Sequence, residues 1–154
     1  MRQDSDNFTT KQEEFKRVTL LIGKKGTGKT KKLIARANEA VKASSGNVVV
    51  IEKGAKLTYD VTHKARLIDT DQYSISGYDM LYGFISGICA GNYDVTDILV
   101  DSTFKICKEG IAGLEEFTKK LQTLSETCST SIVLLISADE ADVPASINAV
   151  CEKV

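Results

Sequence analysis

Apolar residues in this chain fall into short continuous runs that alternate with longer amphipathic stretches. The runs predict strands at about 17–22, 48–51, 65–68, 98–100 and 132–136. The run from Val48 to Ile51 holds no polar residue, which is typical of a strand with both faces buried. Strands of this kind form parallel sheets that helices cover on both sides.

The stretches between the runs carry apolar residues at helical spacing, for example Leu33, Ile34 and Ala37. They predict helices at about 28–44, 76–91 and 111–128, and a final helix that begins near Asp142 and Pro144. The helix at 76–91 is expected to begin at Ser76 because Asp79 follows three residues later, an arrangement that resembles a capping box with Asp in place of Glu. The alternation predicts an α/β fold, namely a three-layer α/β/α sandwich with a mainly parallel sheet.

Residues 23–30 read Gly-Lys-Lys-Gly-Thr-Gly-Lys-Thr, a complete match to the phosphate-binding pattern G-x-x-x-x-G-K-[ST]. They stand between a predicted strand and a predicted helix, which is the context that this pattern needs. Gly23, Gly26 and Gly28 can adopt backbone angles closed to other residues, so successive N–H groups can curl around phosphate oxygens. The following helix directs its positive end at the same anion.

The side chains of this loop complete the predicted nucleotide site. Lys29 can reach the β- and γ-phosphates, and the hydroxyl of Thr30 can hold Mg²⁺. Lys31 lies in the first helical turn, where its charge opposes the helix dipole unless an anion is near, so we expect ATP to stabilise the protein. The predicted phosphate-binding residues are Gly23, Lys24, Lys25, Gly26, Thr27, Gly28, Lys29, Thr30 and Lys31.

A second motif supplies an acid for the metal. The run Asp97-Ile98-Leu99-Val100-Asp101 looks like a Walker B strand, in which apolar residues end in a carboxylate. Mg²⁺ prefers hard oxygen ligands and keeps several waters, which a carboxylate at a strand end can orient. Thr30 and Asp101 are therefore the predicted Mg²⁺ residues.

With these two motifs the chain resembles P-loop NTPases, and its order resembles their RecA-type branch. In that branch an extra strand and helix separate the phosphate loop from the Walker B acid. The resemblance covers most of residues 17–137, and it extends to small stand-alone bacterial ATP-binding proteins of unknown role. It implies a catalytic pair of Lys29 and Glu52, because the water-activating glutamate of RecA-type enzymes commonly ends the strand after the first helix. A solvated strand end beside Lys53 is the alternative interpretation of Glu52.

Two departures from the family pattern concern hydrolysis. Many P-loop ATPases place a glutamate directly after the Walker B aspartate, whereas Ser102 and Thr103 follow Asp101 here. No arginine finger is evident among Arg2, Arg17, Arg36 and Arg66. We therefore expect a neighbouring subunit or a partner protein to supply any such finger.

Features that the sequence lacks bear on the nucleotide base, on the binding partners and on a zinc site. Guanine-specific P-loop proteins usually carry N-K-x-D late in the chain, and Ser137-Ala138-Asp139-Glu140 does not match it, so ATP is favoured over GTP. A net charge of −1 argues against nucleic acid and anionic membranes as partners. The four cysteines are far apart and His63 is the one histidine, which disfavours a zinc site.

Length and composition bound the organisation of the chain. At 154 residues and 42% hydrophobic content, we expect one domain at 17–154, preceded by a flexible extension at 1–16. That extension lacks the apolar core of a signal peptide, and the chain has no run of about 18 apolar residues, so we expect no membrane span. Reduced thiols in a nucleotide-binding domain indicate the cytoplasm.

Three functions remain open at this point. The leading one is a Mg-ATP-binding ATPase that is slow alone and activated by a partner. A small-molecule kinase would use residues 53–79 as its acceptor pocket and lid. A non-hydrolysing nucleotide-sensing module would fit Ser102 in place of a glutamate. Asp69, Asp71 and residues 102–113 are candidates for the substrate or switch side, and Thr103 or Ser137 for sensing the γ-phosphate.

Overall fold

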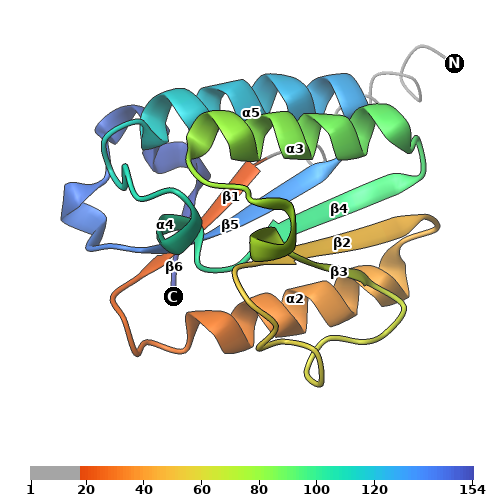
Figure 1. Cartoon of the computed structure of the whole chain (residues 1–154). Coiled ribbons are helices and arrows are strands. Elements are labelled where there is room, and N and C mark those ends of the chain that lie inside the picture. Colours follow the sequence, from red (N-terminus) through yellow and green to blue (C-terminus); the bar gives the residue numbers. More distant parts are fainter. Residues whose placement is uncertain (1–17) are drawn as a thin grey trace, which may run out of the picture.

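The computed structural model describes residues 18–154, so the extension expected at 1–16 lies outside the described residues. Within residues 18–154 six parallel strands form one sheet in the order β3-β2-β4-β5-β1-β6 (Figure 1). The strands are β1 (Val18–Gly23), β2 (Asn47–Glu52), β3 (Arg66–Asp69), β4 (Val95–Val100), β5 (Ser131–Ser137) and β6 (Cys151–Lys153). All strand ends that carry predicted site residues therefore meet at one edge of the sheet.

Helices cover both faces of this sheet. They are α2 (Lys29–Ala43), α3 (Tyr78–Gly91), α4 (Thr103–Ile106) and α5 (Leu114–Cys128), with 3₁₀ turns η1 (Thr70–Tyr73), η2 (Glu140–Asp142) and η3 (Ala145–Val150). Helix α2 lies on one face, and α3 and α5 lie side by side on the other (Figure 1). The predicted three-layer α/β/α sandwich with a parallel sheet is confirmed.

The strands alternate their side chains between two cores, as buried strands must. On β5, Ile132 and Leu134 pack in the core under α3 and α5. Val133 and Leu135 on the same strand pack in the core with Leu33 of α2. Burial of each such aliphatic side chain stabilises the folded state by roughly 1.5–3 kcal/mol relative to exposure. Packing on both faces of the sheet therefore fixes the positions of the strand ends.

The order of the strands brings the two motifs together. Strand β5 separates β1 from β4, and Ser137 at its end is level with Gly23 at the start of the phosphate loop. The N–H of Asp101 donates to the carbonyl of Ile51 at 2.8 Å, so Asp101 lies beside the end of β2. Gly23, Asp101 and Glu52 therefore share the carboxyl edge, where sheets of this class bind ligands.

Two local predictions were wrong. In place of a final α-helix, Pro144 precedes the 3₁₀ turn η3, and the chain then returns to the sheet as β6, whose short polar sequence gives no strand pattern. The cap of α3 is Gly77, not Ser76. The Glu109 carboxylate accepts the N–H of Tyr78 at 3.2 Å and takes the place of the expected cap. Both features depend on contacts between distant parts of the chain.

Candidate functional site

The phosphate loop joins β1 to α2 through two glycines in left-handed conformations. Gly26 has φ 87° and Gly28 has φ 84°, a region that other residues rarely adopt. Inside the loop, the carbonyl of Lys24 accepts the N–H of Thr27 at 3.3 Å, its hydroxyl at 2.7 Å and the ammonium of Lys29 at 2.8 Å. The loop is thus a closed turn built on one carbonyl.

Gly23 does not adopt the special backbone angle expected of it, because its φ is not positive, and close packing is what excludes a side chain there. A Cβ at Gly23 would lie 2.5 Å from the Thr27 hydroxyl oxygen and 3.4 Å from the side chain of Lys29. Contacts under about 3 Å force atoms to move, so the turn depends on the missing side chain. The structure thus brings the glycines of the motif together with Lys29.

Lys29 is a buried cation, with 6% of its surface exposed. Burial lowers the pKa of its ammonium, and the nearby carboxylate of Asp101 opposes that shift. Its hydrogen bond goes to a neutral carbonyl, that of Lys24, which leaves most of the cost of burying a charge uncompensated. An anion held in the loop would compensate this charge, so the site fits a phosphate group.

Thr30 and Asp101 lie together at the start of α2. The Thr30 hydroxyl is 3.4 Å from Oδ1 of Asp101, and the Ser102 hydroxyl donates to Oδ2 at 2.8 Å. Ser102 has φ 52°, a strained conformation for a residue with a side chain, and such strain is common at functional sites. In the described part of the chain no group of three or more His, Cys, Asp or Glu could hold a metal ion, so Mg²⁺ would take its further ligands from phosphate and water.

Glu52 ends β2 with 1% of its surface exposed. Its two carboxylate oxygens accept the N–H of Lys56 at 2.9 Å and of Leu57 at 3.2 Å. Burial raises the pKa of this carboxyl, with Asp101 and Asp69 adding to the shift, and the two backbone hydrogen bonds oppose it. Glu52 is therefore neither a solvated strand end nor a free base here, because it anchors the turn after β2.

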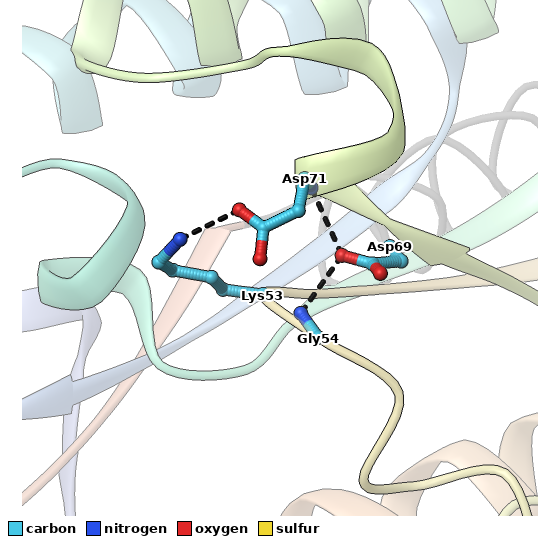
Figure 2. A network of polar contacts seen from close by, with 4 residues as sticks. All are labelled: Lys53, Gly54, Asp69 and Asp71. Carbon is cyan, nitrogen blue, oxygen red and sulfur yellow. Dashed lines mark hydrogen bonds and ion pairs between the residues drawn. The ribbon is translucent and has the colours of Figure 1, made fainter.

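Asp69 and Asp71 serve the same turn from the next strand. Oδ1 of Asp69 accepts the N–H of Gly54 at 2.8 Å and of Asp71 at 2.9 Å, and Lys53 pairs with Asp71 at 2.6 Å (Figure 2). Figure 2 shows these groups bridging the ends of β2 and β3. Both predicted switch-side carboxylates are thus engaged within the protein.

Two cavities flank the phosphate loop. The first, of about 370 Å³, is lined by Lys25, Lys29, Lys31, Lys105, Ser102 and Ser137 among others, with Thr30 at its wall. The second, of about 350 Å³, adjoins Gly23, Lys24 and Thr27 on the β6 side. Of the two residues considered for sensing the γ-phosphate, Ser137 lines the first cavity, whereas Thr103 is fully buried.

Lys105 and Phe104 line the first cavity, and the sequence indicated them only as members of the candidate range 102–113, interpreted as a loop. In the structure they belong to α4, a one-turn helix within that range. The available signal was the spacing Asp101 to Lys105, which places a cation one helical turn beyond the Walker B acid. That spacing is informative only once a helical turn is known to begin at Thr103.

Comparisons with known proteins identify the fold alone. No family model matches the chain, and no curated protein matches it. A solved structure of C. elegans PCH-2 is similar with a TM-score of 0.53 over 90% of this chain, at 15% sequence identity. This chain spans 34% of the PCH-2 chain.

The likeness to PCH-2 concerns the arrangement of strands and helices. The PCH-2 structure shares an α/β fold of this kind, in agreement with the α/β sandwich and parallel sheet expected from the sequence. Across residues 18–154 there is no helix long and apolar enough to cross a membrane.

Proposed function

We propose that this chain is a Mg-ATP-binding P-loop protein of RecA-type order, and an ATPase that is slow alone and activated by a partner. The observation that carries the proposal is the buried ammonium of Lys29 inside a glycine turn, beside the Thr30–Asp101 pair. A closed turn with an uncompensated cation and two hard oxygen groups suits a metal-bound phosphate chain.

The proposed roles follow the positions of the residues. The backbone N–H groups of residues 24–30 and the ammonium of Lys29 would hold the phosphates. Thr30 and Asp101 would hold Mg²⁺, which neutralises charge on the β- and γ-phosphates when bound. The flanking cations Lys25 and Lys31 line the same cavity and add to its attraction for anions.

Slow turnover fits the contacts of Glu52. We assign Glu52 as the general base, yet both of its oxygens hold backbone amides of the turn after β2. Activation of a water by this carboxylate requires at least one of those hydrogen bonds to open. A partner that moves residues 53–57 would release the base, which is our reason for proposing activation by a partner.

A second function, a non-hydrolysing nucleotide sensor, is favoured by the same observation. If the turn at 53–57 never opens, Glu52 is purely an anchor of the turn, and nucleotide binding itself is the output. The small-molecule kinase stays a third hypothesis. Leu57 and Val61, within the segment once considered its lid, are buried in the core with α2.

The described arginines favour an outside partner for charge stabilisation. Arg36 pairs with Glu152, and Arg66 starts β3 at the opposite end of the sheet from the phosphate loop. We propose that a second copy or another protein completes the site, in the cytoplasm, with ATP favoured over GTP and without a role for nucleic acid or membrane.

Thermal unfolding with MgATP, MgADP and MgGTP, followed by phosphate-release assays, tests the proposal. We expect MgATP to raise the melting temperature of the wild type and Lys29→Ala to remove that rise, because Lys29 is the buried phosphate ligand. Turnover without an acceptor supports the ATPase, turnover only with an added acceptor supports the kinase, and binding without turnover supports the sensor. A melting temperature unchanged by all three nucleotides contradicts the proposal.

A further inference from the structure

Lys105 reaches the nucleotide cavity from a part of the chain remote from the phosphate loop. It lies on α4, directly after β4, and lines the 370 Å³ cavity together with Lys25, Lys29 and Lys31. Four lysines thus surround one cavity. Three belong to the predicted loop and helix start, and Lys105 is the fourth.

These four lysines form no close ion pair, although the carboxylate of Asp101 acts on Lys29 from a longer distance. Among residues 18–154, none of the four lies within 4.0 Å of a carboxylate, although six other cations do. The cavity on the other side of the loop differs, because Lys24 pairs with Asp139 at 3.3 Å and Lys153 with Glu140 at 3.6 Å. Positive charge without a close carboxylate therefore gathers at the cavity that Lys105 lines, and it favours the most highly charged part of a ligand there.

The proposed Mg²⁺ residues, Thr30 and Asp101, indicate which end of a bound nucleotide would lie near Lys105. Thr30 and Ser102 line the same cavity, and both hydrogen-bond the carboxylate of Asp101. In a P-loop site, a bound Mg²⁺ would neutralise charge on the β- and γ-phosphates, so the residues that hold it indicate where the terminal phosphate would lie. Lys105 stands on the turn after Asp101, so it belongs to the end of the site where the terminal phosphate lies.

We propose that Lys105 contacts the terminal phosphate of a bound nucleoside triphosphate and makes the site distinguish triphosphate from diphosphate. The proposal rests on the proposed nucleotide-binding function and adds a phosphate ligand outside the loop. Lysine is suited to this role because its ammonium acts as a point charge with three rotatable donors.

The backbone that carries Lys105 is held firmly while its side chain is exposed. The N–H of Lys105 donates to the carbonyl of Ser102 at 2.9 Å, and Ile106 is buried in the core under α3. The carbonyl of Ile106 also accepts the N–H of Gly77 at 3.0 Å, at the start of α3. A contact between Lys105 and the terminal phosphate therefore acts on a turn that is joined to α3.

Dissociation constants for a non-hydrolysable β,γ-imido ATP and for ADP, both with Mg²⁺, test the proposal. We expect Lys105→Ala to weaken triphosphate binding about tenfold, as the loss of one charge-assisted hydrogen bond does, and to change ADP binding less than about twofold. Lys105→Arg should keep most of the triphosphate affinity, since it keeps the charge. Lys108→Ala, an exposed lysine nearby that does not line the cavity, is the matched control.

The outcomes separate this inference from the proposed function. Equal losses for both nucleotides, or no difference between Lys105→Ala and Lys108→Ala, overturn the role of Lys105 and leave the proposed function standing. If the wild type binds neither nucleotide, both proposals fail together. Lys105 is exposed, so circular dichroism is expected to show unchanged folding of each variant.

Discussion

The hydroxyl of Thr30 lies 3.4 Å from Oδ1 of Asp101, although the two residues are 71 positions apart. One begins α2 and the other follows β4, so the sheet alone brings them together. Hydroxyl and carboxylate oxygens are the hard ligands that Mg²⁺ prefers. The two oxygen groups are thus close enough that both would hold one Mg²⁺, directly or through its waters.

Removal of either oxygen group should weaken the metal-dependent part of nucleotide binding. We expect Thr30→Ala and Asp101→Asn to raise the Mg²⁺ concentration needed for half-maximal ATP binding by about tenfold or more, since losses of metal-site residues commonly have this size. A Mg²⁺ titration at fixed ATP measures the effect. Thr123→Ala, on the exposed side of α5, is the control, and equal Mg²⁺ requirements for all variants would refute the assignment.

The close approach at Gly23 predicts a strongly non-additive pair of substitutions. Gly23→Ala places a Cβ 2.5 Å from the Thr27 hydroxyl, so we expect a loss of about 1–3 kcal/mol in the free energy of unfolding. Thr27→Ala removes that oxygen, and in the double variant it should restore part of the loss. Urea unfolding of the four proteins gives the coupling energy.

A glycine in open space provides the control for this cycle. An added Cβ at Gly83, inside α3, meets no atom within 4 Å. Gly83→Ala should therefore stabilise the protein by about 0.5–1 kcal/mol through helix propensity alone. If Gly23→Ala and Thr27→Ala instead lowered the free energy of unfolding additively, the turn would relax around the added Cβ and the contact with the Thr27 hydroxyl would be unimportant.

The phosphate loop and Asp101 could be predicted because their signals are local. The loop is contiguous in sequence, and a carboxylate after a buried parallel strand has a known edge to occupy. The strands followed from continuous apolar runs and the long helices from helical spacing. The run in β5 is apolar throughout because its two faces bury alternating residues in two cores.

The missed features depend on contacts that no local pattern encodes. Ser102, which precedes helix α4, has a left-handed backbone conformation, and the carbonyl of Ile106 in α4 accepts the N–H of Gly77. The position of Lys105 on α4 therefore follows from tertiary structure. Strand β6 exists because β1 offers it an edge. The acceptor for the first N–H of α3, that of Tyr78, comes from Glu109, and propensity at Ser76 could not reveal it.

The contacts of Glu52 predict a graded effect on stability. Glu52→Ala leaves the N–H groups of Lys56 and Leu57 without their acceptor, so we expect a loss of about 2–4 kcal/mol in the free energy of unfolding. Glu52→Gln keeps one acceptor oxygen and should lose less. Faster proteolysis within residues 53–65 should accompany the loss, which limited digestion measures.

Glu52→Ala and Glu52→Gln also distinguish a structural role of Glu52, as an anchor of the turn after β2, from a catalytic role as a general base. If Glu52 is the general base, Glu52→Gln abolishes turnover while nucleotide affinity stays close to that of the wild type. Glu39→Gln, an exposed change on α2, controls for the loss of one charge. Stability of Glu52→Ala equal to that of the wild type would contradict the anchoring role.

From the buried carboxyl of Asp97 we predict that its replacement by asparagine stabilises the protein by an amount that depends on pH. It lies inside β4 level with Val48 and Ser131, and burial raises the pKa of its carboxyl above the ordinary 3.8, against the opposing hydrogen bond from the Thr96 hydroxyl. A raised pKa means that the folded state holds the proton more tightly than the unfolded chain. The contribution of Asp97 to stability is therefore fully present below pH 3.8 and is lost as the pH rises through the folded pKa.

Asp97→Asn removes this loss, because asparagine cannot ionise and its oxygen can still accept from Thr96. We expect the variant to unfold at higher urea concentration than the wild type at pH 7, with the difference shrinking towards pH 3. Urea titrations at pH 3, 5 and 7 measure it, and Asp60→Asn, on the exposed turn after β2, accounts for the change in net charge. If the advantage of Asp97→Asn were equal at all three pH values, its cause would lie in packing, because a desolvated carboxylate is penalised only while it is ionised.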